Sequence, residues 1–390
     1  MERILMTGAT GAYGSEILRE LVKWKIHVTC IVRAKNHKQA SERVRAILGT
    51  TRGVRAIPGD VTRPLCGVSA FDQEQMKGQI DSILHCAAAI SFVDEKLNYD
   101  VNVNGTNNLT SLADAIGAWR WHHISTVYTA GEKSVLLETD RPNANSHQPR
   151  NYYETTKQIG EAIALGWRAS MEDRRISIYR PSILIGRDDD AGSTPTFDAF
   201  YGYVKPLYKM AQTIRRKFKV GKLGQGVYVD NDGLIHAPIA LMMNSDSTLN
   251  VVPIDWAARS MVGLLRKSAV KDAAFHMAHD EPPNTRWMLR VVLNHFGIQG
   301  VQVVETAEEY QKAVKELPKG AKPLQRSVSP ILQQFDPYTN HNPYFGMERH
   351  MSELGDGFQP PPRITKEFLE RLLDYAIKHN WEAPTTSAFV

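Results

Sequence analysis

A tyrosine and a lysine at helical spacing are the clearest candidates for chemistry in this sequence. Tyr153 and Lys157 are four residues apart in the run Asn151–Lys157, so on a helix both side chains project from one face. A lysine ammonium group beside a phenol is expected to lower the phenol pKa from ~10 toward neutrality. The tyrosine could then exchange a proton with a substrate oxygen while a hydride moves.

Two hydroxyl side chains precede this pair, at the end of an apolar run that predicts a strand at His122–Ser125. A hydroxyl group of Ser125 or Thr126 could bind the same substrate oxygen and polarise a carbonyl. Thr126 is the preferred candidate and Ser125 the alternative. The two histidines of the run, His122 and His123, lack metal-ligand spacing to any cysteine or carboxylate cluster. We therefore expect core or surface packing for both histidines and predict no metal site.

A glycine-rich turn near the N-terminus predicts a nucleotide cofactor. The segment Thr7–Gly14 follows a short apolar run and opens an amphipathic stretch. Its glycines stand where a backbone must approach a pyrophosphate at the N-terminus of a helix, and a tight strand-to-helix turn without a ligand is the structural alternative. The residues expected to contact the cofactor here are Thr7, Gly8, Thr10, Gly11, Ala12, Tyr13 and Gly14.

The end of the second expected strand, His27–Val32, indicates which cofactor is bound. Arg33 follows it, where a fold that prefers NAD would place an acidic residue on the ribose 2′-hydroxyl. A guanidinium group matches a 2′-phosphate bidentately and stays charged, which favours NADPH. Arg43 is a second, weaker phosphate candidate, and a solvated arginine at a strand end is the structural alternative for Arg33.

Two further segments could lie along a flat cofactor. Asp60, followed by Val61, comes after the strand expected at Arg55–Pro58; its carboxylate could accept a hydrogen bond from the adenine amine or could cap a turn. Three small residues follow the strand expected at Ser82–His85, namely Ala87, Ala88 and Ala89. They would allow a cofactor to pass close to the backbone, although a tightly packed strand end would need the same residue types.

Short apolar runs that alternate with amphipathic stretches predict the frame for these residues, a doubly wound parallel Rossmann sheet. The expected strands are Arg3–Met6, His27–Val32, Arg55–Pro58, Ser82–His85, His122–Ser125 and Ile176–Tyr179, with helices such as Ser15–Trp24 and Gly105–Ile116 between them. After Ile185 the alternation breaks into a loop and a mostly helical, basic stretch at Phe197–Lys222.

The remaining pattern predicts a second, smaller and mostly helical lobe. A strand at Leu249–Pro253 and a helix at Trp256–Lys267, with Asp255 as its cap, are expected to return to the sheet, and the helix Thr365–His379 closes the chain. We therefore expect an NADP-binding domain at residues 1–190 together with 245–275. The substrate lobe is expected at residues 191–244 and 276–390.

Taken together, the motifs resemble the extended short-chain dehydrogenase/reductase superfamily over roughly residues 1–270. Within it they are most similar to the thioester reductase and fatty acyl-CoA reductase branch, whose NAD-binding part is of the male-sterility type. The resemblance is carried by Gly8, Gly11 and Gly14, and by the runs Ile31–Ala34, Ile124–Thr126, Tyr153–Lys157, Tyr179–Gly186 and Asn250–Asp255.

The resemblance implies an active site formed by Tyr153, Lys157 and Thr126, with Asn102 supporting it through a water. It also implies hydride delivery from NADPH to a thioester or aldehyde carbonyl, giving an aldehyde or an alcohol. The further cofactor contacts that it implies are Asn104, Pro181, Ser182 and Ile183, with Pro181 and Ser182 against the nicotinamide.

Composition sets limits on the class of protein. With 42% hydrophobic and 23% charged residues, the chain is typical of a globular protein. The net charge of +5 from 47 basic and 42 acidic residues is too balanced to indicate nucleic acid. The three cysteines, Cys30, Cys66 and Cys86, are expected to be reduced structural thiols, and no apolar run reaches the ~18–20 residues of a membrane helix. We expect a cytoplasmic protein.

A basic stretch with apolar residues at helical spacing could bind an acidic partner. Its basic residues are Lys205, Lys209, Arg215, Arg216, Lys217, Lys219 and Lys222. An acyl carrier protein, coenzyme A phosphates or an anionic membrane surface would fit, and a solvated helix face is the structural alternative.

Two rival functions share the cofactor motifs. One is another extended-family enzyme, such as a sugar-nucleotide epimerase or dehydratase or a hydroxysteroid-type dehydrogenase, although Arg33 counts against epimerases that retain NAD. The other is a non-catalytic NADP sensor or scaffold, which the Tyr153 and Lys157 pair opposes because a sensor needs no tuned phenol.

Overall fold

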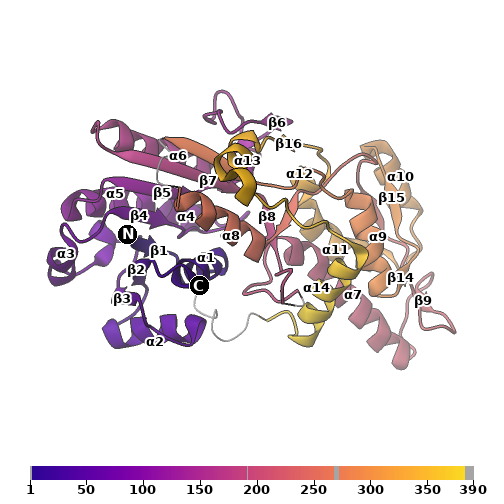
Figure 1. Ribbon diagram of the computed structural model, residues 1–390. Coiled ribbons are helices and arrows are strands. Elements are labelled where there is room, and N and C mark those ends of the chain that lie inside the picture. The colour runs from indigo at the N-terminus through magenta and orange to yellow at the C-terminus, as the bar shows by residue number, and fades with distance from the viewer. Residues whose placement is uncertain (1, 191, 268–271, 383–390) are drawn as a thin grey trace.

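Seven parallel strands form the central sheet in the computed structural model, which describes residues 2–190, 192–267 and 272–382 (Figure 1). Across the sheet the order is β3-β2-β1-β4-β5-β7-β13, and every neighbouring pair is parallel. The strands are β1 (Arg3–Thr7), β2 (His27–Val32), β3 (Val54–Pro58), β4 (Ser82–His85), β5 (Arg120–Ile124), β7 (Arg175–Pro181) and β13 (Ala273–Met277). The order reverses between β1 and β4, where ligands of doubly wound sheets bind.

Helices cover both faces of this sheet. One apolar core joins its strands to α1 (Ala12–Lys23), α2 (His37–Leu48) and α8 (Ile254–Leu265). A second core joins them to α3 (Ala70–Met76), α5 (Gly105–Ile116) and α6 (Tyr152–Ala169). Because both faces are covered, the central strands are buried on both sides; β1, β2 and β4 are rich in apolar residues, whereas β5 and β7 also bury histidine, serine and arginine side chains.

A third core belongs to the lobe that lies to the right of the sheet in Figure 1. Its helices are α7 (Phe200–Lys219), α9 (Thr285–His295), α10 (Ala307–Glu316), α11 (Lys322–Gln333), α12 (Asp336–Thr339) and α14 (Lys366–Lys378). Short strands complete it: β8 (Ile183–Ile185), β9 (Tyr228–Val229), β10 (Ile235–His236), β11 (Ala240–Met242), β12 (Val251–Pro253), β14 (Ile298–Gln299) and β15 (Gln302–Val304). The predicted class, a doubly wound parallel sheet with a smaller helical lobe, is confirmed.

The chain returns from the lobe to the sheet before its last helix. Strand β16 (Tyr344–Phe345) pairs with β6 (Val135–Leu136), and α13 (Glu348–Leu354) packs on α8 and β13. Residues 344–354 therefore belong to the edge of the sheet in space.

Two sequence predictions need correction here. Strand β13 was absent from the predicted strands because its run of two alanines and a histidine lacks the branched residues that mark a strand. Asp255 does not cap α8, whose N-cap is Pro253. Its buried carboxylate instead accepts a hydrogen bond from the backbone N–H of Asp188 at 3.1 Å and pairs with Arg259 at 2.9 Å, which holds the loop after β8.

Candidate active site

The glycine turn after β1 leaves no room for a side chain at Gly8 or Gly14. Gly8 has a positive φ of 72°, and a Cβ there would lie 2.4 Å from the backbone nitrogen of Ala87. A Cβ at Gly14 would lie 2.0 Å from the Gly8 carbonyl oxygen. Gly11 is the N-cap of α1 and offers no side-chain acceptor to the first-turn N–H groups. This turn can therefore present backbone donors to a pyrophosphate.

The side chain of Tyr13, one of the residues predicted to contact the cofactor, points into the core. The Tyr13 hydroxyl donates to the carbonyl of Ala257 at 3.0 Å, and the ring is buried between α1 and α8. The Tyr13 side chain thus serves the core, and only its backbone N–H can serve a cofactor. Helical spacing explains this placement, since residue 13 begins the buried face of α1.

Two arginines meet beside the glycine turn. Arg33 follows β2 and is exposed, and its carbonyl oxygen accepts a hydrogen bond from the Arg43 guanidinium group at 2.6 Å. The same guanidinium lies 3.4 Å from the Thr10 hydroxyl. Burial, and then the positive charge of Arg33, lower the pKa of Arg43. This arrangement gathers positive charge at the end of β2, where an adenosine ribose would lie.

Asp60 caps a turn, which was one of the two roles predicted for it; the other was a hydrogen bond to the adenine. Its carboxylate accepts hydrogen bonds from the backbone N–H and the hydroxyl of Thr62, at 3.0 and 2.8 Å. The neighbouring Val61 packs against Gly105, whose Cβ position is 3.1 Å from a methyl of Val61. The adenine contact of Asp60 stays a prediction.

Asn102 joins the alanine segment after β4 to the helix that carries Tyr153. It lies in a π-helical turn, Tyr99–Asn104, a geometry common at functional sites. Its side chain accepts from the N–H of Ala89 at 2.8 Å and donates to the Ala89 carbonyl at 3.0 Å and to the Thr156 hydroxyl at 3.1 Å. The support through a water that the resemblance implies stays a prediction. Asn104, at the end of the same turn, donates to the Asp100 carboxylate at 3.2 Å.

The predicted catalytic side chains meet where β5 ends. Tyr153 and Lys157 lie in the first turns of α6. The Lys157 ammonium donates to the carbonyl of Ile124, the last residue of β5, at 2.7 Å. The Thr126 hydroxyl lies within hydrogen-bond reach of the Tyr153 phenol, whereas the Ser125 hydroxyl is buried without a partner among the described residues. The preference for Thr126 over Ser125 stays a prediction.

Burial dominates the electrostatics of this pair. It raises the pKa of Tyr153 above its usual range, as does the Glu154 charge, while the hydrogen bond to Thr126 opposes the shift. We expected Lys157 to lower the pKa of Tyr153, and this is wrong for the structure described here. The spacing of the two residues predicts that they share one face of the helix, but it does not predict how deeply the phenol is buried. Burial also lowers the pKa of Lys157 to about 8, opposed by Cys86 and Glu161.

The end of β7 and the residues that follow it lie on the other side of the site. The Pro181 carbonyl accepts a hydrogen bond from the Thr126 hydroxyl at 3.2 Å. The Ser182 hydroxyl is buried without a partner in the described part of the chain, and its backbone N–H donates to Met277 at 2.9 Å. Ile183 begins β8 and pairs with Val251. Pro181 and Ser182 thus border the same space as Thr126.

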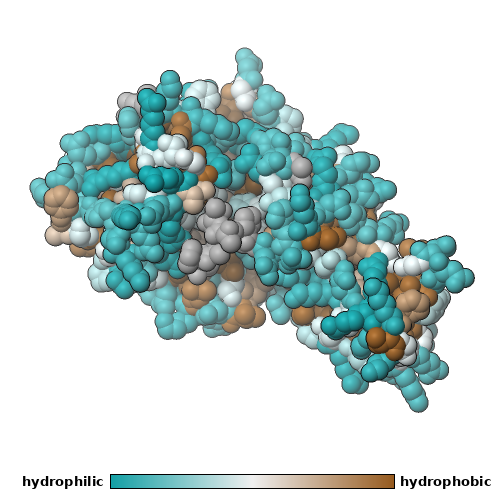
Figure 2. All heavy atoms as spheres, turned by 90° about the horizontal axis from the view of Figure 1, so that it is seen from below, coloured by the Kyte–Doolittle hydropathy of each residue, from teal (hydrophilic) through white to brown (hydrophobic). Residues whose placement is uncertain are grey.

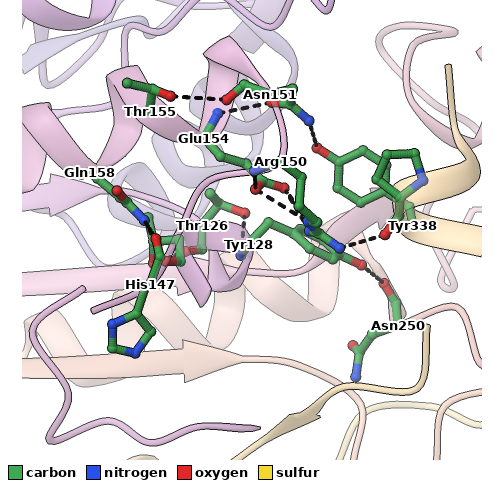
Figure 3. Close-up of polar contacts among 12 residues, drawn as sticks. Thr126, Tyr128, His147, Arg150, Asn151, Glu154, Thr155, Gln158, Asn250 and Tyr338 are labelled. Carbon is green, nitrogen blue, oxygen red and sulfur yellow. Dashed lines mark hydrogen bonds and ion pairs between the residues drawn. The ribbon is translucent and has the colours of Figure 1, made fainter. Parts of the chain in front are cut away.

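Sequence reasoning missed a polar cluster at the start of α6 (Figure 3). The Arg150 guanidinium group pairs with the Glu154 carboxylate at 2.6 Å, and both side chains are buried. The same guanidinium lies 4.7 Å from the ring centre of Tyr338, a lobe residue. The spacing of four between Arg150 and Glu154, on either side of Tyr153, was a usable signal. Nothing local marks Tyr338.

A second buried ion pair, also missed, lies one turn beyond Lys157. Glu161 of α6 receives two hydrogen bonds from Arg180 of β7, at 2.9 and 2.7 Å. Arg180 directly precedes Pro181, so this pair links the helix that carries Tyr153 to the strand that ends at the site. His122 and His123 are buried in β5, the first of the two placements expected for them.

Cavities alone do not locate this site. One of about 520 Å³ lies at the opposite end of the sheet, where Arg3, His27 and Val54 begin their strands. Another, of about 190 Å³, lies in the lobe between α7, α10 and α11, and its lining includes Tyr203 and Asp336.

Across residues 2–190, 192–267 and 272–382, no group of His, Cys, Asp and Glu side chains could hold a metal ion. None of the helices described there has both the length and the apolar character of a membrane span.

Comparison with known proteins adds the family. The chain matches the family described as "Male sterility protein" over residues 6–261. It is 25% identical over 389 residues to a linear gramicidin synthase protein of Brevibacillus parabrevis, covering 95% of this chain and 7% of that protein. The chain therefore corresponds to a small part of that relative.

Two solved structures have the same fold. The terminal R domain from the myxalamid PKS-NRPS biosynthetic pathway aligns with a TM-score of 0.75 and 19% identity, covering 98% of this chain and 92% of that one. A thiolation-reductase di-domain from an archaeal non-ribosomal peptide synthetase aligns with a TM-score of 0.67 and 19% identity, covering 97% and 76%. With the glycine turn and the Tyr153 and Lys157 pair in place, the chain belongs to the male sterility protein family of extended short-chain dehydrogenases/reductases.

Proposed function

We propose that the protein is an NADPH-dependent reductase of acyl thioesters. Bound NADPH would supply the hydride to the carbonyl carbon. Tyr153 gives a proton to the carbonyl oxygen, Thr126 orients that oxygen by a hydrogen bond, and Lys157 holds the ribose. The observation that carries the proposal is the meeting of these three side chains at the end of β5, next to the glycine turn.

The arginine pair supports NADPH over NADH. The Arg43 guanidinium group lies beside Thr10, and the positive charge of Arg33 is close enough to lower the pKa of Arg43. Two cations are therefore available to a 2′-phosphate that would extend from the ribose. Guanidinium groups bind phosphate with charge-assisted hydrogen bonds. A dianionic phosphate would also remove the mutual repulsion of the two cations.

The thioester substrate is supported by the relatives. The archaeal neighbour joins a reductase to a thiolation domain, and the other two are a linear gramicidin synthase and a terminal domain of a biosynthetic pathway. We therefore favour an acyl group carried on a carrier protein, with coenzyme A as the alternative carrier. Reduction to the aldehyde requires one hydride, with the thiol as leaving group, and a second hydride would give the alcohol.

The structure narrows the surface proposed for an acidic carrier. In α7, Lys205 donates to the Trp381 carbonyl and Arg215 to the Phe296 carbonyl, so these two cations serve the lobe itself. The exposed basic residues of the stretch are Lys209 and those of its far end, within Arg216–Lys222. The face seen from below is largely hydrophilic, with hydrophobic residues in separate small groups (Figure 2). A charged partner suits such a surface better than a purely apolar one.

The test is NADPH consumption with acyl-CoA and acyl-carrier thioesters and their aldehydes. Tyr153→Phe should lower kcat by about 100-fold or more, since general acid catalysis contributes about that much. Tyr152→Phe, which removes the neighbouring hydroxyl, is the matched control and should retain activity. An active Tyr153→Phe variant, or no turnover of any thioester or aldehyde by the wild type, would refute the proposal.

A further inference from the structure

The first turn of α6 carries Tyr153 and is held by its N-cap. Asn151 accepts a hydrogen bond from the N–H of Glu154 at 3.1 Å through its side-chain oxygen. The N–H groups of a first turn have no partner inside the helix, so this turn depends on capping contacts. Lys157, one turn later, is held separately by β5. The position of Tyr153 therefore depends on what fixes Asn151 and its neighbours.

Arg150, which precedes the N-cap, binds a side chain of this first turn. Its backbone N–H and its guanidinium group both donate to the Glu154 carboxylate, at 2.8 and 2.6 Å. The guanidinium also donates to the carbonyl of Pro337 in α12. A buried ion pair is stable only when its remaining hydrogen-bonding groups are satisfied, and here the lobe supplies one of the partners.

Tyr338 of α12 makes the second link from the lobe (Figure 3). The side-chain amide of Asn151 donates to the Tyr338 hydroxyl oxygen at 2.6 Å. The Tyr338 ring lies under the Arg150 guanidinium and meets the Tyr128 ring edge-on, with 4.9 Å between ring centres. Tyr338 is 6% exposed, so these contacts are made inside the protein and are little screened by water.

We propose that Tyr338 is a positioning residue for the reaction. Through Asn151 and Arg150, the lobe helix α12 sets the location of the helix turn that carries Tyr153. The substrate lobe thereby contributes to proton transfer as well as to substrate binding. This inference rests on the proposed role of Tyr153 as the proton donor.

Tyr338→Phe tests it, because this change keeps the ring and removes only the hydroxyl that binds Asn151. Loss of one hydrogen bond of this kind should lower kcat about threefold to tenfold. NADPH affinity, measured by fluorescence titration, should stay within about twofold of the wild type because other elements hold the cofactor site. The matched control is Tyr344→Phe, which removes a half-exposed hydroxyl that donates to Glu348 at 2.9 Å; it should leave kcat unchanged.

A double-mutant cycle identifies the hydrogen bond itself. Asn151→Ser retains a capping oxygen but loses the amide that donates to Tyr338. Its kcat should equal that of Tyr338→Phe, and the double variant should be no slower than either single variant. Fully additive losses would overturn the proposal, as would equal losses of kcat and NADPH affinity in Tyr338→Phe, which indicate general disruption.

Tyr153→Phe, measured in the same assay, separates the two proposals. An inactive Tyr153→Phe variant together with a Tyr338→Phe variant as active as Tyr344→Phe would overturn only the role of Tyr338. An active Tyr153→Phe variant would overturn the proposed function and this inference with it.

Discussion

Replacing Arg33 with alanine should change the cofactor preference of the protein while leaving its fold intact. The side chain is exposed at the end of β2, and its backbone carbonyl, which holds the Arg43 guanidinium, is retained in the variant. The substitution therefore removes one cation from the proposed phosphate site and leaves the second in place.

The expected magnitude follows from the kind of bond that is lost. A hydrogen bond to a charged group contributes about 1.5–3 kcal/mol, which corresponds to about 10- to 150-fold in affinity. Because Arg33 is exposed, solvent screening favours the lower end. We expect the Kd for NADPH to rise about 10- to 30-fold, and the Kd for NADH, which lacks the 2′-phosphate, to change less than about twofold.

The assay is fluorescence titration of wild type and Arg33→Ala with both cofactors at two salt concentrations. Arg45→Ala is the control, since it removes an exposed arginine from the same helix as Arg43. The preference of the wild type for NADPH should weaken at high salt, and that of Arg33→Ala should weaken less. Equal effects on both cofactors, or an unchanged preference, would refute the assignment of the 2′-phosphate to this arginine.

Two further predictions concern the lysine and the glycine turn. Burial lowers the pKa of Lys157 to about 8, so the ammonium group that we propose holds the ribose loses its proton as pH rises through that value. NADPH affinity should therefore fall above about pH 8, and an NADPH affinity that stays constant up to about pH 10 would contradict this. The same lowered pKa means that burying the protonated lysine costs free energy of folding at all pH values below about 8. This cost disappears as pH rises from about 8 toward the ordinary lysine pKa, so the protein should become more stable over that interval. Gly14→Ala places a Cβ 2.0 Å from the Gly8 carbonyl oxygen, so the midpoint of thermal unfolding should fall and NADPH binding should be lost. Gly166→Ala is the control; there is open space around its Cβ position, so this change should be neutral or slightly stabilising. Equal melting curves for the two variants would argue against the tight turn.

The frame of the site could be predicted because its signals are local. Buried parallel strands are rich in apolar residues, and the glycine turn and Arg33 each follow such a strand directly. Thr126 follows the end of β5, whose two histidines are also buried. Strand β13 escaped prediction because Ala273–Met277 has a weak strand composition and is defined by pairing with β7. The side-chain direction of Tyr13 also depends on a partner distant in sequence, α8.

Long-range contacts likewise explain what could not be predicted about the catalytic helix. Tyr153, Lys157 and Glu161 follow one another at intervals of four along α6, a pattern visible in the sequence. Each successive turn is held by a different element: the first by α12 of the lobe, the second by β5 and the third by Arg180 of β7. Spacing predicts that the three side chains share a face, but their burial and charge state depend on these three anchors. Only the first of these anchors comes from the lobe, so a change in the lobe should displace Tyr153 more than Lys157. For this reason we expect such a change to lower kcat, which depends on Tyr153, without an equal loss of cofactor affinity, which depends on Lys157.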